Sequence, residues 1–595
     1  LSSAASDVYK RQHVLTPMPD FSESAPILLP APKSVKWGGG FLPWDKAEFK
    51  IDSVGLPVGD FLSLEYPGGM PAQNYEISVS ESGIKVRAGS EKGARLALQT
   101  LRQIGMQSDK RGFRFVEISD APDLEVRGFM LDISRCKVPK LGELAKLVDM
   151  LALFKYNRLE LYTEHTFAFE GHELVWADAS PLTAAAVRKL GEICASAGIE
   201  LVPNMNGLGH MERWLRYPKY AHLAESKAPF VDPLGTVRKY PTTLYPDGNA
   251  LDFMDSLYAQ FLPNFESENF NIGGDEPWEL GMGRSKAQCE AEGGKYGIYI
   301  RHILGLRERA EKYGKKVCFW ADVLMQSPKY SERLPADMTP ILWGYYLDHP
   351  YEQQCSYMER LGRKYLVAPG TSTWNSFGSR WDCAYENIKT ACDCAKRHGA
   401  EGMILTQWGD GGNHQPWCAM YPALVLGGAA SWGMCPSAET VCEALDKFVF
   451  IDGTGNFSRA LCMLGRADPV MKLFCFYHKI FFASPEDAKK LSAECGYDFS
   501  AIEGTADFAL ALSESSSPAC RDGELCKTEL SLGVEMIKWA MRKARGDFST
   551  ETDSQQRDLK IIVSRYENIW LERAAVGGLC ESAGRIRAIR PDIFA

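Results

Sequence analysis

Residues 126–163 read VRGFMLDISRCKVPKLGELAKLVDMLALFKYNRLELYT, and their pattern sets the architecture of the central region. Gly128–Ser134 and Arg158–Thr163 are candidate strands, and Leu141–Phe154 between them has the apolar spacing of an amphipathic helix. Two strands joined through a crossover helix lie parallel in one sheet. The stretch therefore predicts a β-α-β unit.

The same alternation continues to about Trp432. Ala184–Ala197 is a second amphipathic crossover, and the further strand candidates are Ile199–Met205, Asn269–Gly273, Val317–Trp320, Ile341–Tyr345, Tyr365–Ala368 and Gly402–Trp408. Together with the first two strands they predict a parallel sheet that closes into a (β/α)8 barrel, the TIM-barrel fold.

The two ends of the chain have different patterns. Tyr75–Ser80 and Ile84–Arg87 alternate around a Ser-Gly turn, an amphipathic helix follows, and the pattern after Ala438 is helical. We therefore expect an α/β protein with these parts: an unstructured N-terminal segment (1–26), a small α/β domain (27–121), the barrel (122–437) and an α-helical C-terminal domain (438–595). For the last part we expect packing or a homodimer contact.

Composition excludes several classes of partner. Lys and Arg total 67 against 76 Asp and Glu, and the formal charge of -9 repels phosphate backbones, so we expect neither nucleic acid nor an anionic membrane as a partner. The longest apolar stretch, Met420–Cys435, is too short for the ~20 residues of a spanning helix.

Cysteine usage and the N-terminus bear on the compartment. The 17 cysteines are scattered without a C-x-x-C pair, which favours reduced thiols. Leu1–Gln12 lacks the apolar core of a secretory signal, so we expect a cytoplasmic protein, with a signal upstream of Leu1 as the alternative. No H-E-x-x-H motif, paired Cys/His spacing or phosphate-binding glycine loop is present, and we expect neither a metal nor an organic cofactor.

In a TIM barrel the reactive groups collect at the carboxyl ends of the strands. The residues at the eight predicted ends are Asp132 and Arg135; Glu164 and His165; Asn204, Asn206 and His210; Asp275 and Glu276; Trp320 and Asp322; Trp343, Tyr345 and Tyr346; Trp374 and Asn375; Trp408 and Asp410. A single tryptophan is more often part of a core, but indoles at several successive ends suit the apolar face of a sugar ring, whose hydroxyls the carboxylates and the arginine would bind. This set favours carbohydrate binding.

The segment Asn271-Ile-Gly-Gly-Asp-Glu-Pro-Trp278 is the sharpest local signal. Adjacent strand residues point to opposite faces, but Gly273 and Gly274 permit a break that turns Asp275 and Glu276 toward one side. Most retaining glycosidases place two carboxyl groups ~5–5.5 Å apart across the anomeric carbon, which sequence neighbours can hardly do, whereas substrate assistance by a 2-acetamido group suits adjacent acids. The bland alternative is an ordinary charged loop after a strand.

Several motifs match one family independently. They are Pro30-Ala-Pro-Lys-Ser-Val with Ala97-Leu-Gln-Thr-Leu-Arg102, Arg127-Gly-Phe-Met-Leu-Asp-Ile-Ser-Arg135, Gly209-His210, the Asp-Glu pair after Ile-Gly-Gly, Trp320-Ala-Asp322 and Trp408-Gly-Asp410. Over residues 27–432 the sequence resembles glycoside hydrolase family 20, the β-N-acetylhexosaminidases. The resemblance implies a retaining exo-glycosidase that releases terminal β-linked N-acetylglucosamine or N-acetylgalactosamine from glycans by substrate-assisted catalysis.

The resemblance also implies roles. Glu276 would be the general acid and then the base, and Asp275 would orient the acetamide. The substrate-binding residues expected around them are Arg135, Glu164, His210, Trp320, Asp322, Trp343, Tyr345, Trp374, Trp408 and Asp410, of which Glu164 and His210 would support the others. An ionised Asp275 in a site dried by indoles should keep Glu276 protonated.

The sequence departs from the family at three places: Asn271 replaces a common histidine, Asp410 a glutamate, and Gly370-Thr-Ser-Thr-Trp-Asn375 the usual Trp-Tyr-x-Asp. The donor to the acetamide oxygen would then be Trp374, Tyr345 or Tyr346. Two other functions remain open: a glycosidase for a sugar without an acetamide, with Asp322 or Asp410 as nucleophile, and a non-catalytic carbohydrate-binding protein.

Overall fold

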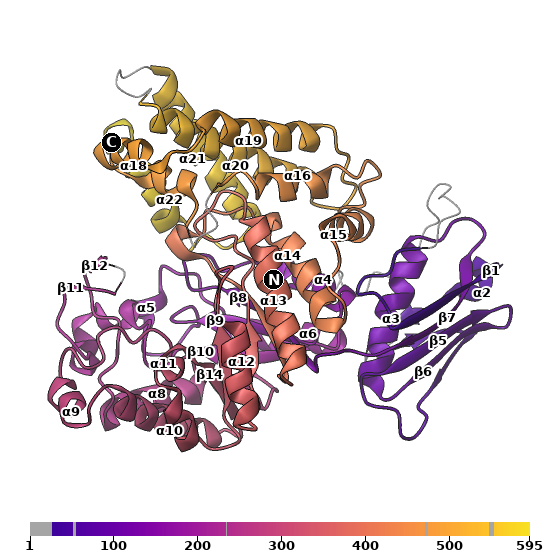
Figure 1. Cartoon of the computed structure of the whole chain (residues 1–595), viewed down its shortest axis with the longest axis horizontal. Coiled ribbons are helices and arrows are strands. Elements are labelled where there is room, and N and C mark those ends of the chain that lie inside the picture. Colours follow the sequence, from indigo (N-terminus) through magenta and orange to yellow (C-terminus); the bar gives the residue numbers. More distant parts are fainter. Residues whose placement is uncertain (1–25, 52–54, 234, 470–473, 547–552, 595) are drawn as a thin grey trace.

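The computed structural model describes residues 26–51, 55–233, 235–469, 474–546 and 553–594. The segment 1–26 that we expected to be unstructured lies outside these residues, apart from Pro26. Figure 1 shows a small sheet with one long helix, a central barrel and a layer of helices at the C-terminal end of the chain.

The predicted barrel is confirmed. Within the described residues, eight parallel strands close in the order β10-β13-β14-β15-β16-β17-β8-β9. Their bounds are β8 Val126–Asp132, β9 Arg158–Thr163, β10 Glu200–Met205, β13 Asn269–Asn271, β14 Lys316–Trp320, β15 Thr339–Trp343, β16 Leu366–Ala368 and β17 Gly402–Gln407. The fourth strand ends at Asn271 and not at Gly273, because Gly273 has a φ of 70° and leaves the extended region.

Helices surround the barrel. The larger ones are α4 Leu141–Leu153, α6 Ala184–Ser196, α8 Gly248–Phe261, α10 Tyr296–Glu311, α12 Tyr351–Arg360, α13 Trp381–Arg397 and α14 Tyr421–Trp432. Between them lie the short elements α5 Glu173–Trp176, α7 Glu212–Leu215, η1 Pro218–Leu223, β11 Phe230–Val231, β12 Val237–Arg238, η2 Leu262–Asn264, α9 Lys286–Ala291, α11 Asp322–Gln326, η3 Pro328–Arg333, η4 Asp410–Gly412 and η5 Trp417–Met420.

The apolar stretch around α14 is a buried helix that follows the last barrel strand. All twelve of its residues are buried, and it contacts β17, β8 and α13. A helix that is apolar on every side belongs in the core of a large protein or in a bilayer, and here the core accounts for it. Among the described residues, no helix is long and apolar enough to cross a membrane.

The N-terminal sheet has the order β1-β7-β5-β6-β4. Its bounds are β1 Ser34–Leu42, β4 Leu62–Glu65, β5 Tyr75–Ser80, β6 Gly83–Ala88 and β7 Phe113–Asp120, with α2 Trp44–Ala47, β2 Lys50–Ile51, β3 Pro57–Val58 and α3 Glu91–Met106 beside it. A buried ion pair of 2.8 Å between Lys155 and Asp120 ties the sheet to the barrel, and the indole of Trp432 donates to the same carboxylate. A buried ion pair is stable when hydrogen bonds also satisfy the oxygen that the cation does not contact, which is Oδ1 of Asp120 here.

The C-terminal part is helical, as expected. Its elements are α15 Ala438–Leu445, η6 Asp446–Phe450, α16 Phe457–Leu464, α17 Phe476–Phe482, α18 Pro485–Cys495, α19 Phe499–Glu514, α20 Gly523–Ala544, α21 Asp553–Arg573, α22 Leu579–Arg587 and η7 Pro591–Ile593. In Figure 1 these orange and yellow helices lie along one side of the barrel. Core residues of α20, α21 and α22 belong to the same hydrophobic cluster as the barrel helices.

Candidate active site

The interior of the barrel holds an aromatic cluster separate from the main core. It contains the four indoles and the phenol that the sequence predicted at strand ends: Trp320, Trp343, Tyr345, Trp374 and Trp408. They pack with Met130, Tyr162, Cys318, Ile341, Leu366, Ala368 and Ile404. Residues that point into a barrel stack in layers, so side chains from distant parts of the sequence meet there. The structure thus brings the five predicted aromatic residues together.

Contacts among the rings hold this cluster in place. The indole nitrogen of Trp408 donates to the Tyr345 hydroxyl at 2.8 Å, and Trp343 stacks on Tyr345 with ring centroids 5.2 Å apart. Trp374 packs edge-on behind Tyr345 at 5.0 Å and is nearly fully buried. Trp320 lies 6.2 Å from Trp408, centroid to centroid. Ring pairs with these geometries stabilise one another and make a rigid apolar surface.

The two adjacent acids follow a break in the backbone. Gly273 and Gly274 both have positive φ, as does Glu276 at 45°. A Cβ atom at Gly273 would lie 1.8 Å from the side-chain oxygen of Asn206, so no larger residue fits there. The break is the one that the glycine pair predicted, and a positive φ at a glutamate marks a backbone held by its surroundings.

His210 lies between the two acids. Its Nε2 atom is 3.2 Å from Asp275 Oδ2 and 3.5 Å from Glu276 Oε2, so both carboxyl groups face the same side. Burial lowers the pKa of His210, but the charges of Asp275 and Glu276 outweigh burial and raise it to about 9. The imidazole is therefore a cation at neutral pH.

The two acids have opposite pKa shifts. Burial raises the pKa of Asp275, but the His210 cation outweighs it and holds this pKa below its usual value. Burial also raises the pKa of Glu276, where the charge of Asp275 adds to the effect and His210 opposes it. The Glu276 side chain remains 31% exposed, while Asp275 is buried. The pair therefore consists of an ionised inner acid and an outer acid that keeps its proton to higher pH.

Asp322 contacts the backbone of Glu276, the outer acid. Its carboxylate accepts the backbone N–H of Glu276 at 3.2 Å. Burial, together with the charges of Asp275 and Glu276, raises the pKa of Asp322 to about 7. Asp322 thus contacts the backbone of Glu276, while its contact with a substrate stays a prediction.

Arg135 joins the remaining predicted polar residues. Its guanidinium lies 3.5 Å from Glu164, 3.7 Å from Asp410 and 3.3 Å from Asp132. It also lies over the rings of Tyr162 and Trp408, at 4.6 and 5.0 Å. Asp410 is 39% exposed and Glu164 is buried, so the network runs from solvent into the barrel.

The sequence argument missed some members of this network. Tyr162 donates to Glu164 at 3.0 Å and accepts from Asn206 at 2.7 Å, and Asp132 accepts the backbone N–H groups of Ser134 and Gly409. Asp132 and Asn206 stood at predicted strand ends but received no role. Tyr162 lies two residues before Glu164, so strand alternation places both on one face and was the available signal.

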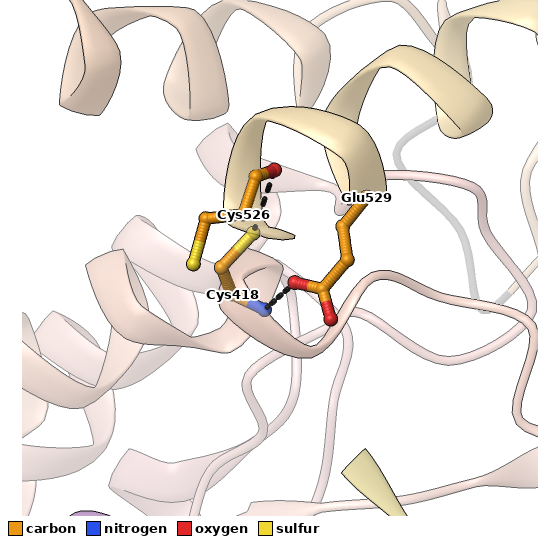
Figure 2. A group of neighbouring side chains, drawn as sticks. All are labelled: Cys418, Cys526 and Glu529. Atoms are coloured by element: carbon orange, nitrogen blue, oxygen red, sulfur yellow. Dashed lines mark hydrogen bonds between the residues drawn. The ribbon is translucent and has the colours of Figure 1, made fainter. Parts of the chain in front are cut away.

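Among the described residues, two thiols and one carboxylate have potential metal-ligand atoms within 4.8 Å of one another. They belong to Cys418, Cys526 and Glu529, which are all buried (Figure 2). Cys418 lies on η5, and the other two lie on α20. The guanidinium of Arg573 bonds both Glu529 oxygens, at 2.8 and 3.2 Å, and the Cys526 sulfur at 3.3 Å. Because this cation already neutralises the carboxylate, we interpret the group as a contact between the barrel and the C-terminal helices.

A (β/α)8 barrel with carboxyl groups beside an aromatic cluster at the strand ends suits a glycoside hydrolase. Residues 125–374 match the glycosyl hydrolase family 20 catalytic domain, and residues 45–121 match domain 2 of the same family. Together the two matches cover more than half of the chain. The chain belongs to glycoside hydrolase family 20.

Relatives agree with this assignment, and a solved structure has the same fold. The β-hexosaminidase subunit A1 of Dictyostelium discoideum is 26% identical over 216 residues, which is 34% of this chain and 39% of that protein. The β-hexosaminidase of Akkermansia muciniphila is 26% identical over 228 residues, or 35% and 46%. The chain thus spans less than half the length of these two relatives. The Flavobacterium johnsoniae chitobiase structure, 15% identical, has the same fold over 95% of this chain and 99% of that chain, with a TM-score of 0.59.

Proposed function

We propose that the chain is a retaining exo-β-N-acetylhexosaminidase that releases terminal β-linked N-acetylglucosamine or N-acetylgalactosamine through substrate-assisted catalysis. The observation that carries the proposal is the single cation, His210 Nε2, within 3.5 Å of both Asp275 and Glu276. Both acids follow strand β13 and contact the same imidazole, which favours a position on one side of a bound sugar. Substrate assistance suits that arrangement better than a pair of carboxyl groups on opposite sides of the anomeric carbon.

The first step uses both acids. Glu276 transfers its proton to the glycosidic oxygen, and the bond between that oxygen and C1 breaks as the acetamide carbonyl oxygen of the sugar bonds to C1. The product of this step is an oxazolinium ion, and Asp275 accepts a hydrogen bond from its N–H and balances its positive charge. The lowered pKa of Asp275 and the raised pKa of Glu276 favour an ionised Asp275 and a protonated Glu276, as this step requires.

The second step returns the enzyme to its starting state. Glu276, now ionised, takes a proton from a water molecule whose oxygen bonds to C1, and the bond from C1 to the acetamide oxygen breaks. Two inversions at C1 retain the β configuration. The exposed fraction of Glu276 supports this role, because the acid must reach both the leaving group and water.

The rest of the site would bind the sugar. Arg135 and Asp410 would hold ring hydroxyls, and Trp320, Trp343 and Trp408 would contact the apolar ring face. A charged network at the end of the site suits the hydroxyls of a terminal sugar, which supports exo action.

Tyr345 is our choice for the donor to the acetamide oxygen. Its hydroxyl oxygen accepts the Trp408 N–H, and the phenol also bonds the Thr406 side chain, whose own hydroxyl donates to the Pro369 carbonyl. A bound acetamide would take the phenolic proton in place of Thr406. Trp374 lies behind Tyr345 in the aromatic cluster, and Tyr346 is 43% exposed, so both are less suited to a fixed contact inside the barrel.

Substituting Asp275 by Asn tests the proposal. With an aryl β-N-acetylglucosaminide, we expect kcat to fall about 100-fold or more while KM changes little, because the contact with the developing positive charge is lost. A thiazoline analogue of the oxazolinium ion should inhibit the natural enzyme tightly and the variant weakly. A wild-type enzyme that hydrolyses only sugars without an acetamide, and ignores the thiazoline, would favour the rival glycosidase. Absence of hydrolysis with retained sugar binding would favour the binding protein.

A further inference from the structure

Residues 574–582, which we call the C-terminal strap, connect α21 to the first turn of α22 and contact three loops of the barrel. These loops follow Arg135, His210 and Asp410, which are more than 160 residues from the strap in sequence. The same three residues meet at the Arg135 guanidinium, which lies 3.4 Å from His210 Nδ1 and 3.7 Å from Asp410. The strap thus contacts the part of the chain next to each member of this network.

The first contact is with the loop after Arg135. The N–H of Ala575 donates to the Val138 carbonyl at 3.0 Å. Gly578, with a φ of 76°, packs so closely on Cys136 that a Cβ atom would lie 1.8 Å from its carbonyl oxygen. Cys136 itself has a φ of 71°, so the loop next to Arg135 has a backbone conformation that its neighbours must maintain.

The second contact is with the loop after His210. Glu581 of the strap forms an ion pair of 2.5 Å with Arg213, which lies three residues after His210. The side chains are 37% and 19% exposed. Burial raises the pKa of Glu581, but the Arg213 charge outweighs it and holds this pKa below the usual value, so the carboxylate is ionised when the pair forms.

The third contact is with the loop after Asp410. The Ser582 hydroxyl bonds the Gly412 carbonyl and lies 2.7 Å from the Tyr566 hydroxyl, which in turn donates to the Asn413 carbonyl at 3.2 Å. His414 bonds the Ser582 carbonyl at 3.1 Å. Backbone carbonyls of this loop therefore accept hydrogen bonds from Ser582 of the strap and from Tyr566 of α21.

We propose that the C-terminal strap is a positioning element of the active site, with Glu581 fixing the His210 loop and Ser582 fixing the Asp410 loop. This inference rests on the proposed function. Catalytic groups on loops keep a productive geometry only when other contacts hold the loops, and a displacement of about 1 Å can cost about 100-fold in rate. Glu581 and Ser582 act through Arg213 and Gly412.

The test compares Glu581→Gln with Arg587→Gln. Arg587 lies on the same helix, beyond the strap, and pairs with Glu567 of α21, with side-chain exposures of 37% and 29% that resemble those of the Glu581 pair. We expect Glu581→Gln to lower kcat about 10-fold on an aryl β-N-acetylglucosaminide, because His210 no longer holds both acids. Arg587→Gln should stay within about twofold, and the two variants should have the same melting temperature within a few degrees.

Two further measurements separate positioning from general stability. Ser582→Ala should raise KM more than it lowers kcat, since Asp410 contacts sugar hydroxyls and not the reacting bond. Exchanging the charges, Glu581→Arg with Arg213→Glu, should recover at least half of the lost kcat. Equal effects of Glu581→Gln and Arg587→Gln, or no recovery in the exchanged pair, would overturn the proposal.

Hydrogen–deuterium exchange keeps the two hypotheses distinguishable. Glu581→Gln should speed exchange in residues 211–217, and Ser582→Ala in residues 411–416, whereas Arg587→Gln should change neither. If the natural protein hydrolyses no N-acetylhexosaminide, the proposed function fails while this measurement still tests the strap. If the natural protein is active and exchange in both loops is unchanged in both variants, the strap proposal fails alone.

Discussion

Two buried charge clusters in this molecule show how a site for chemistry differs from a site for stability. Around His210, two acids share one titratable cation, and one of the acids is 31% exposed. Around Arg573, whose side chain is 0% exposed, Glu529, Glu143 and Asp522 surround a cation that does not lose its proton. The His210 cluster can gain or lose a proton and contact a ligand. The charge of Arg573 is fixed, and its side chain contacts only protein.

The sharpest way to break this comparison is to remove the proton donor. Replacing Glu276 by Gln should lower kcat by about 1,000-fold for a disaccharide, because a poor leaving group needs protonation. The loss should shrink to about tenfold or less for an aryl glycoside whose leaving group has a low pKa. Steady-state kinetics on both substrates checks this, and equal losses would show that Glu276 is not the acid.

Removing the fixed cation should affect stability instead of chemistry. Arg573→Met leaves the buried Glu529 without its cation, while Glu143 and Asp522 keep only Lys146, and we expect the free energy of unfolding to fall by about 3–5 kcal/mol. Arg542→Met, which removes an exposed pair with Asp558, should cost about 1 kcal/mol or less. Urea unfolding measures both. If Arg573→Met lowers kcat but leaves the free energy of unfolding unchanged, that result would contradict the distinction between the clusters.

The titratable cation predicts a pH dependence of stability. The pKa of His210 is about 9 in the folded protein, above the value of about 6.5 for a free imidazole, so protonation favours the folded state. This stabilisation is complete below about pH 6.5 and is lost as the pH rises through 9, and it amounts to at most about 3 kcal/mol. The difference in unfolding free energy between the natural protein and His210→Asn, measured from pH 6 to 10, isolates the effect. A flat difference would show that folding does not shift the pKa of His210.

Much of the fold followed from local patterns. Strand β9 was predicted at Arg158–Thr163 and has those bounds in the structure, with Arg158 and Glu160 buried as an ion pair of 2.7 Å. The break after β13 also followed from sequence, because only glycine readily takes the φ of Gly274. Where a pattern is set within a few residues, sequence is a sufficient guide.

Contacts between distant residues were harder to predict. Nothing near His210 indicates that it lies between two acids more than sixty residues away, and its positive φ of 57° is unusual for a histidine. The ion pair between Arg213 and Glu581 spans 368 residues. Periodicity predicts which face of an element is buried, but the choice of partner across the fold depends on packing that one sequence does not encode locally.

The smallest expected effect concerns metal removal. Three potential ligands converge at Cys418, Cys526 and Glu529, but Arg573 already bonds Glu529 and lies 3.3 Å from the Cys526 sulfur. Burial raises the pKa of the Cys418 thiol well above its usual value, which disfavours the thiolate that a metal requires. We therefore expect a chelator to leave both kcat and the melting temperature unchanged within error, and Cys418→Ser to behave likewise under chelation. A drop in melting temperature on chelation in the natural protein but not in Cys418→Ser would assign a metal to this cluster and make Arg573 a group that gives way to it.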